Sequence, residues 1–303
     1  MKPLSQFNKV KLVYYTGTGG TEKVTDLFRE NLINRGKQVE VEKISSNNNV
    51  VSKFNGNSID NIDFLVLLFP VYACNAPEAV YKWIKNLKNN CNIPTAIISV
   101  SGGGEISPNT ACRVSVIKML ENKECNVFYE RMIVMPSNWI VPTRYPLSKM
   151  LFEILPYKIQ KTLDDVENGV IRRTKPLFID KIISRIAEIE KSFTGDFGKY
   201  IKVSEDCNLC GQCYENCPSN NIELIGEKLK FGSKCHSCLG CIYACSKNAL
   251  KPSKFQFIVL KEGYNIKKME KQDSVEITDE ETIKRIAKGY LWKGVKKYLL
   301  ETD

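Results

Sequence analysis

Short apolar runs alternate with stretches of helical spacing along the first half of the chain. The first run, Lys9 to Tyr15, ends at a turn rich in Gly and Thr, and helical spacing from Glu22 to Arg35 follows it. Strands and helices that alternate in this way build parallel sheets with helices on both faces, so the pattern predicts an α/β domain. Further runs and helical stretches are Val39–Val41, Phe64–Phe69, Pro77–Leu87, Ala96–Val100, Asn109–Glu121 and Met132–Met135.

Helical patterns continue beyond this region. The pattern over Pro176–Phe193 gathers isoleucines on one face, so we expect this helix to pack that face against the sheet domain. A second pattern, over Glu280–Leu300, predicts a helix near the end of the chain. We divide the chain into a first domain (1–140), a helical connector (141–198), a cysteine-rich domain (199–254) and a Lys-rich extension (255–303). The isoleucines of the expected packing face are Ile179, Ile182, Ile183, Ile186 and Ile189.

Eight of the twelve cysteines form two runs of identical spacing, C-x2-C-x2-C-x3-C. Such crowding favours metal binding over disulfides, and structural zinc fits less well because its ligands usually come as two separated pairs. Three thiolates in one run can surround a corner of a cubane iron-sulfur cluster, and the fourth ligand then comes from the other run. This rule assigns Cys207, Cys210, Cys213 and Cys245 to one 4Fe-4S cluster, and Cys235, Cys238, Cys241 and Cys217 to a second.

Other residues of the cysteine-rich domain have simpler expected roles. His236 lies between two predicted ligands, and we expect it to be solvated, the alternative being a hydrogen bond that shifts a cluster potential. Gly211 and Gly240 are expected to permit tight turns, and Pro218 to end the first run rigidly. The remaining cysteines, which we expect to be small buried side chains, are Cys74, Cys91, Cys112 and Cys125.

The Gly- and Thr-rich turn after the first strand predicts a phosphate site. Its N–H groups and hydroxyls stand where an anion meets a helix N-terminus. The turn lacks the Gly-Lys-Ser/Thr of a triphosphate loop, and Glu22 occupies a position where a dinucleotide fingerprint needs Gly. Hydroxyl and amide donors alone can hold a monophosphate, which favours flavin mononucleotide (FMN). The loop residues are Thr16, Gly17, Thr18, Gly19, Gly20 and Thr21.

Both halves resemble known families. Residues 16–21 are similar to the Ser/Thr-x-Thr-Gly-x-Thr loop of flavodoxins, although Gly20 stands where flavodoxins usually have Asn. The two cysteine runs resemble those of bacterial ferredoxins with two 4Fe-4S clusters, and the order of the modules resembles flavodoxin-ferredoxin fusion proteins. The resemblance implies a flavodoxin-like, doubly wound five-stranded parallel sheet with FMN at the switch point between strands one and three. It also implies a small α+β ferredoxin domain.

The flavodoxin resemblance also implies that two later loops flank the flavin ring. Tyr72 is expected to stack on the ring, the alternative being that it only closes the core. We expect the loop from Met135 to Trp139 to pack Trp139 into the domain, the alternative being that this loop caps the cofactor pocket. The implied contacts are Pro70, Tyr72, Cys74 and Asn75 from one loop, and Ser101, Gly102, Gly103 and Gly104 from the other.

Charge and hydropathy narrow the class of partner. The formal net charge is +10, and two oxidised clusters with their thiolates would lower it to about +6. A basic surface attracts acidic redox proteins, and the lack of a basic motif interleaved with aromatics argues against nucleic acid. The N-terminal residues do not read as a signal peptide, and the longest apolar stretch is too short for membrane insertion. We therefore expect a cytoplasmic protein of an anaerobic or reducing cell.

These expectations combine into an electron-transfer protein that passes electrons between FMN, two 4Fe-4S clusters and a redox partner. We assign no catalytic residue. Two alternatives remain open at this point. One is a flavin-dependent oxidoreductase acting on an organic substrate or a nicotinamide cofactor, and the other is a ferredoxin whose first domain binds no flavin and serves for docking.

Overall fold

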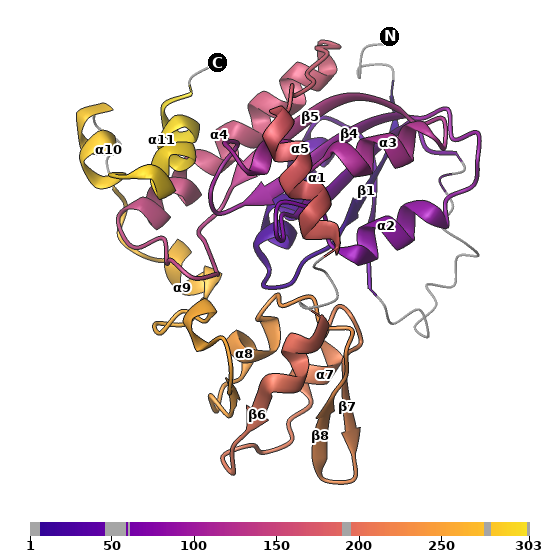
Figure 1. Cartoon of the computed structure of the whole chain (residues 1–303). Coiled ribbons are helices and arrows are strands. Elements are labelled where there is room, and N and C mark those ends of the chain that lie inside the picture. The colour runs from indigo at the N-terminus through magenta and orange to yellow at the C-terminus, as the bar shows by residue number, and fades with distance from the viewer. Residues whose placement is uncertain (1–6, 46–58, 60, 190–194, 276–279, 302–303) are drawn as a thin grey trace.

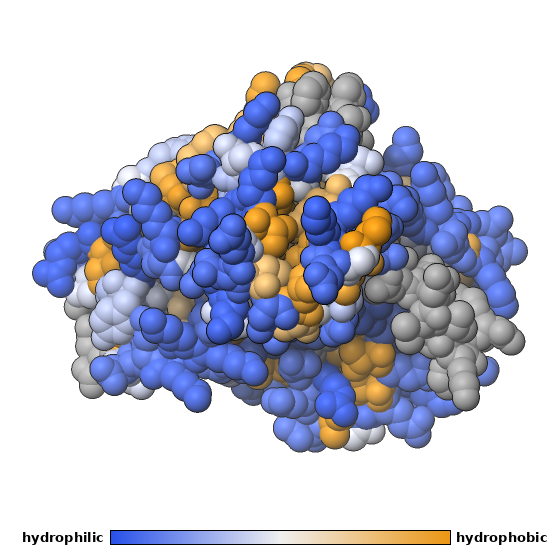
Figure 2. Space-filling view, turned by 90° about the horizontal axis from the view of Figure 1, so that it is seen from below, coloured by the Kyte–Doolittle hydropathy of each residue, from blue (hydrophilic) through white to orange (hydrophobic). Residues whose placement is uncertain are grey.

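The computed structural model describes residues 7–45, 59, 61–189, 195–275 and 280–301. Figure 1 shows a sheet domain above, the cysteine-rich domain below it and the last helices to one side. Seen from below, in Figure 2, hydrophilic side chains dominate the surface and apolar side chains form patches between them. In the part of the chain that the structure describes, no helix is both long and apolar enough to span a bilayer.

The sheet domain has the strand order of flavodoxins. Five parallel strands lie in the order β2-β1-β3-β4-β5, which is the doubly wound order 2-1-3-4-5. The predicted doubly wound parallel sheet is therefore confirmed. Successive strands are added toward one edge up to β2 and toward the other edge from β3 on, so the switch point lies between β1 and β3, where a flavodoxin-like fold places its ligand. The strands are β1 (Lys9–Tyr14), β2 (Gln38–Lys43), β3 (Phe64–Pro70), β4 (Pro94–Ser101) and β5 (Asn126–Val134).

The apolar runs are continuous because both faces of the sheet are covered. Alternate residues of β3 point to opposite faces, so Val66 and Leu67 enter different cores. Helices α1 (Gly20–Asn34) and α4 (Leu147–Glu167) cover one face. Helices α2 (Glu78–Lys85) and α3 (Val114–Glu121) cover the other, and the short helix η2 (Asn109–Ala111) precedes α3.

Helix α5 (Phe178–Ile189) packs with the face opposite to the one we predicted. Its polar residues are the buried ones: Asp180 is 0% exposed and accepts hydrogen bonds from Ser107 (2.6 Å) and Thr110 (2.5 Å). By contrast Phe178 is 79% exposed. Hydrogen bonds therefore set the orientation of α5, and residues 190–193 of the predicted helix lie outside the described residues. The exposed apolar side chains of this helix are Phe178, Ile179, Ile182 and Ile186.

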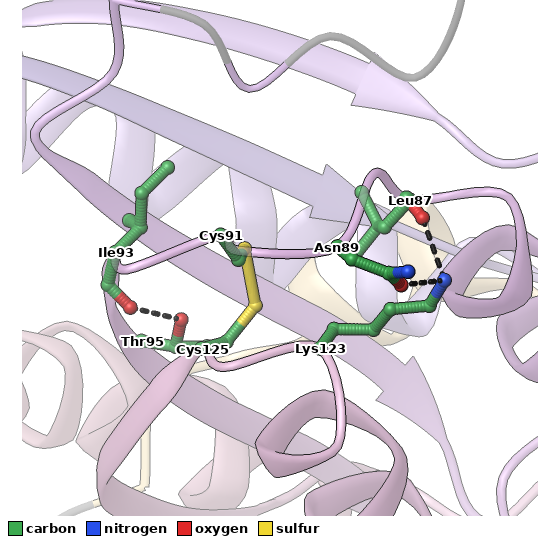
Figure 3. Close-up of a disulfide and its surroundings, with 7 residues drawn as sticks. All are labelled: Leu87, Asn89, Cys91, Ile93, Thr95, Lys123 and Cys125. Carbon is green, nitrogen blue, oxygen red and sulfur yellow. Dashed lines mark hydrogen bonds between the residues drawn. A yellow bond between two sulfur atoms is a disulfide. The ribbon is translucent and has the colours of Figure 1, made fainter.

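Cys91 and Cys125 form a disulfide, contrary to the prediction that each is a separate small buried side chain. Figure 3 shows the bond between the segments that lead into β4 and β5. The two Cα atoms lie 5.1 Å apart, within the usual range for disulfides. The Lys123 ammonium donates to the Leu87 carbonyl beside it. The disulfide therefore ties the amino ends of two strands, at the edge of the sheet opposite their carboxyl ends.

The cysteine-rich domain contains two short antiparallel strand pairs and short helices. Strands β6 (Ile201–Val203) and β9 (Leu250–Pro252) pair antiparallel, as do β7 (Ile222–Ile225) and β8 (Lys228–Phe231). The helix η3 (Asp196–Tyr200) leads into β6. Helices α7 (Gln212–Glu215) and α8 (Gly240–Ala244) each follow a cysteine of a run, and Phe197, Ile201, Leu239 and Leu250 form the small core.

The C-terminal extension returns to the sheet domain. Its elements are η4 (Gln256–Ile258), α9 (Ile266–Glu270), α10 (Glu280–Ile286), η5 (Tyr290–Trp292) and α11 (Lys293–Leu300). Ile283 and Tyr298 pack with Leu151 of α4 in a core of their own. The single helix predicted over 280–300 is interrupted at Gly289, whose φ of 91° is outside the helical region.

Candidate functional site

A pocket opens at the carboxyl ends of the strands, beside the switch point. Its walls come from the loops after β1, β3, β4 and β5 and from the C-terminal extension. The structure brings nine of the fourteen predicted flavin contacts to this pocket. They are Thr16, Gly17, Thr18, Gly20, Thr21, Pro70, Tyr72, Ser101 and Gly102.

The loop before α1 is shaped as an anion site. Gly19 has a φ of 89° and donates its N–H to the Thr16 hydroxyl (3.0 Å), which fixes the turn. The first N–H groups of α1 have no acceptor within the helix. The Thr21 hydroxyl oxygen is buried and has no hydrogen-bond partner among the described residues, although it borders the pocket. A buried orphan hydroxyl beside free helix N–H groups fits a bound phosphate.

The other predicted flavin contacts lie near the pocket without bordering it. Asn75 is buried, and its side chain exchanges hydrogen bonds with Ser184 of α5, donating to the carbonyl (2.8 Å) and accepting from the hydroxyl (2.6 Å). Cys74 has a φ of 59°, and burial, together with nearby Asp180, raises the pKa of its thiol. Asn75 therefore anchors α5, and its side chain is not available to a flavin.

The second flanking loop, which follows β4, contacts the start of α11. Gly103 donates its N–H to the Ser101 hydroxyl (3.1 Å). Gly104 has a φ of 78°, and a Cβ atom there would lie 2.6 Å from the carbonyl carbon of Gly294, at the start of α11. The C-terminal extension therefore packs against this loop. The sequence did not indicate that contact.

Sequence reasoning missed several residues of the pocket. Asn138 donates from its amide to the Thr18 hydroxyl (2.9 Å), and Tyr264 donates from its hydroxyl to the Pro136 carbonyl (3.0 Å). Trp139 is 44% exposed, so the prediction that it packs into the domain was wrong, and it does not border the pocket either. The position of Asn138 in the loop after β5 could have indicated that it lines the pocket. Tyr264 lies far along the chain, and no motif in the sequence around it indicates a place in the pocket. The lining residues outside the fourteen predicted contacts are Val71, Val100, Met135, Pro136, Asn138 and Tyr264, and three of them belong to the loop that was the alternative cap of the pocket.

A buried ionic network fixes the segment that follows the second loop. Arg113, only 1% exposed, donates to Glu130 (2.6 Å) and to the Ser99 hydroxyl (2.7 Å), and it also contacts Glu105. Burial alone would raise the pKa of Glu105, but Arg113 and a hydrogen bond from Thr174 hold it below its usual value. A carboxylate at 105 is therefore part of the folded structure at neutral pH.

Four cysteines of the predicted second set border one small cavity. Cys217 comes from the first run and joins Cys235, Cys238 and Cys241 of the second, which is the crossed set that the spacing predicted. Burial raises the pKa of the Cys238 thiol to about 12 and that of Cys235 to about 11, and nearby thiols of the same set add to both. The wall also contains apolar side chains, namely Phe197, Ile201, Ile222, Phe231 and Leu239.

The predicted first set consists of three cysteines of the first run and Cys245 of the second. Burial raises the pKa of Cys213, and the thiols of Cys207 and Cys210 raise it further. Cys210 is exposed, and Cys245 packs beside Cys213 against the small core. Among the described residues, no three His, Cys, Asp or Glu side chains converge on a single metal ion. A cubane does not require such convergence, because each cysteine binds a different iron.

The backbone of the two runs repeats. Leu209 and Gly211 have positive φ in the first run, and Ser237 and Leu239 take the same positions in the second. Cys217 accepts a hydrogen bond from the N–H four residues later, as does Cys245, each at 3.3 Å. Such N–H···S bonds stabilise a thiolate. Gly211 makes the tight turn predicted for it, whereas in the second run Leu239 does so, and Gly240 is needed for another reason.

Gly240 lies at a close contact between the two candidate sites, which leaves no room for a side chain. A Cβ atom on Gly240 would collide with the carbonyl oxygen of Gly17 in the phosphate loop. A Cβ atom on Gly17 would lie 2.5 Å from the Cβ of Cys238 and 3.2 Å from its Sγ, and would also collide with the Tyr72 hydroxyl. His236, which we expected to be solvated, lies 2.6 Å through Nδ1 from the Tyr15 hydroxyl. The second cysteine run therefore packs directly on the phosphate loop.

Comparisons with known proteins agree with this division. Residues 199–246 match the protein family described as "4Fe-4S dicluster domain". No curated protein matches the chain. Among solved structures, the chain is similar to rubredoxin oxygen:oxidoreductase of the anaerobe Desulfovibrio gigas (12% identity, TM-score 0.38, 56% of this chain and 37% of that one). It therefore spans little more than a third of that protein.

Two flavodoxins are also similar. One comes from the domain Archaea (9% identity, TM-score 0.36, 54% of this chain and 98% of that one). The other is the flavodoxin of Streptococcus pneumonia TIGR4 (13% identity, TM-score 0.38, 54% of this chain and 99% of that one). At these scores the fold assignment rests on the strand order. Residues 199–246 are thus a segment of the 4Fe-4S dicluster type, and they follow a domain with the flavodoxin strand order.

Proposed function

We propose that this protein carries electrons between FMN, bound at the carboxyl edge of the sheet, and two 4Fe-4S clusters, and from the clusters to a redox partner. The observation that carries the proposal is the contact between Cys238 and Gly17. One residue would bind a cluster and the other would cradle the flavin phosphate. Two redox groups held on either side of such a contact are suited to exchange electrons directly.

Different residues of the pocket would bind the phosphate and the ring of the flavin. The N-terminus of α1 and the Thr21 hydroxyl would hold the phosphate, which needs donors and no lysine. Tyr72 and Tyr264 border the same pocket and would contact the ring, and burial raises the pKa of each phenol. The Tyr264 hydroxyl donates to the Pro136 carbonyl, so it can only accept a hydrogen bond from the ring, whereas Tyr72 would contact the ring as a neutral phenol. Bound FMN supplies electron exchange in single or paired steps.

The cysteine-rich domain would supply eight thiolates in the two crossed sets. Cys235, Cys238 and Cys241 are partly buried, which limits the access of water to one set, and backbone N–H groups donate to the sulfur atoms of Cys217 and Cys245. The chain contributes binding and electrostatics here, while the clusters would contribute the redox chemistry.

Anaerobic purification followed by quantitation of iron, sulfide and FMN tests the proposal. It predicts about eight irons and about one FMN per chain, from two four-iron clusters and one flavin. A content of about one or two zinc ions instead of iron would refute the cluster assignment. A full complement of iron without flavin would favour a docking role for the sheet domain. Hydride transfer from NADH or NADPH to the bound flavin would favour an oxidoreductase.

A further inference from the structure

The two cysteine sets lie at different depths relative to the flavin pocket. Cys238 and Gly240, both in the second run, contact Gly17 of the phosphate loop. His236 of the same run contacts the Tyr15 hydroxyl at the end of β1. The set formed by Cys217, Cys235, Cys238 and Cys241 therefore adjoins the sheet domain.

The other set reaches the surface. Cys210 is exposed, and its neighbours Asn208 and Gln212 are exposed as well. Cys213 of this set lies in α7 and Cys241 of the other set lies in α8; the two helices contact each other, and both cysteines pack against the same small core. The two sets are therefore neighbours, and the set that includes Cys238 is the one that contacts the phosphate loop.

We propose a fixed order of electron transfer: partner, outer cluster, inner cluster, flavin. The inner cluster is the one on Cys217, Cys235, Cys238 and Cys241, and the outer cluster is the one on Cys207, Cys210, Cys213 and Cys245. This inference rests on the function proposed above and assigns each cluster its own exchange partner. Electron tunnelling slows steeply with distance, so the cluster that touches the phosphate loop exchanges with the flavin, and the exposed one exchanges with a one-electron carrier protein.

The electrons balance along this route. A reduced carrier protein gives one electron to the oxidised outer cluster and is itself oxidised. The cluster held by Cys207, Cys210, Cys213 and Cys245 would then be reoxidised by the one held by Cys217, Cys235, Cys238 and Cys241, and that one in turn by the flavin, so that each cluster would end in its starting oxidation state. Two such passages, with two protons from water, reduce the flavin completely. The reverse direction uses the same steps with an oxidised carrier protein as acceptor.

Paired cysteine substitutions test the order by electron paramagnetic resonance. A reduced cluster close to a partly reduced flavin speeds the spin relaxation of the flavin signal, so the microwave power needed to saturate that signal rises. Each variant must first retain FMN and about four irons, the content of one cluster. In Cys210→Ser we expect the raised saturation power to persist, and in Cys238→Ser we expect it to be lost.

A second pair, Cys207→Ser and Cys241→Ser, repeats the comparison should either first variant lose both clusters. The reverse pattern, with the effect lost only in Cys210→Ser or Cys207→Ser, would overturn the order. Wild-type protein that holds FMN and eight irons but shows no raised saturation power would overturn it too. Failure of the proposed function looks different, because protein without FMN gives no flavin signal in any variant.

Discussion

The Tyr15 hydroxyl and Nδ1 of His236 lie 2.6 Å apart, across the boundary between the sheet domain and the cysteine-rich domain. Tyr15 is fully buried at the end of β1, and His236 is the only histidine in the chain. This bond joins the first strand of one domain to a cysteine run of the other. It is therefore one of the contacts that hold the inner cluster site against the flavin pocket.

Replacing Tyr15 with Phe removes this hydrogen bond and leaves the ring in place. We expect the free energy of unfolding to fall by about 0.5–1.5 kcal/mol, the usual net value of one hydrogen bond. The thermal midpoint of iron-loaded protein, measured without oxygen, checks this. The control is Tyr145→Phe, since Tyr145 is 51% exposed. Equal midpoints for the two variants would show that the contact with His236 adds no stability.

Thr21→Val tests the phosphate site. The hydroxyl of Thr21 is a buried orphan without ligand, so its loss should not destabilise flavin-free protein. A hydrogen bond to a charged group contributes about 1.5–3 kcal/mol, so FMN should bind roughly 10- to 100-fold more weakly. Fluorescence titration of flavin-free protein with FMN measures the affinity. In the control, Thr25→Val, the affected hydroxyl donates to the Thr21 carbonyl within α1, and affinity should not change.

Glu105→Gln should make stability depend on pH in a defined direction. The pKa of Glu105 is lowered in the folded protein, so its contribution is present above the ordinary value of 4.5 and is lost as the pH falls through the folded pKa. At neutral pH the variant should unfold about 1–3 kcal/mol more easily, since Arg113 loses a charged partner. Urea unfolding of both proteins at several pH values gives the difference.

That difference should shrink below pH 4.5, the ordinary pKa of a Glu side chain. Both proteins carry the same cofactors, so their effects cancel in the comparison. Glu30→Gln serves as the control, because Glu30 is exposed. A difference that stays constant into the acid range would show that the Glu105 carboxylate does not stabilise the fold.

Two substitutions in α5 test its orientation. Phe178→Ser changes a side chain that is 79% exposed, so we expect stability to stay within about 0.5 kcal/mol of the wild type. Asp180→Ala leaves the hydroxyls of Ser107 and Thr110 without their acceptor, and a loss of about 1–3 kcal/mol is expected. Urea unfolding measures both. The opposite ranking would mean that the apolar face is the buried one, as periodicity alone predicts.

The sequence was most informative where the signal is local. The run Phe64–Phe69 is apolar at every position because a central parallel strand is buried on both faces, so its role could be read directly. The loop 16–21 contains, within six residues, the hydroxyl and N–H donors that predict a phosphate site. The spacing, with the rule that the fourth cysteine of each run serves the other cluster, also predicted the grouping of Cys217 with the second run, and these four cysteines border one cavity.

Prediction from the sequence was wrong or incomplete where contacts with residues far along the chain determine the structure. Ile182 looks like a core residue of an amphipathic helix, yet Thr110 and Asn75 bind the polar face of that helix and turn the isoleucine outward. Cys91 and Cys125 are 34 residues apart, and no motif relates them. Tyr264 reaches the pocket only because the chain returns to the sheet after the cysteine-rich domain. Hydrophobic periodicity contains no information on such partners.

The proposed function requires one flavin and two clusters to exchange electrons within a single chain. Anaerobic titration with a reduced one-electron donor, followed by flavin and cluster absorbance, shows whether they do. We predict uptake of about four electrons per chain, two by the flavin and one by each cluster, with both chromophores bleached by the same donor. A flavin that stays oxidised once the clusters are reduced, and is bleached only by NADH or NADPH, would contradict the account.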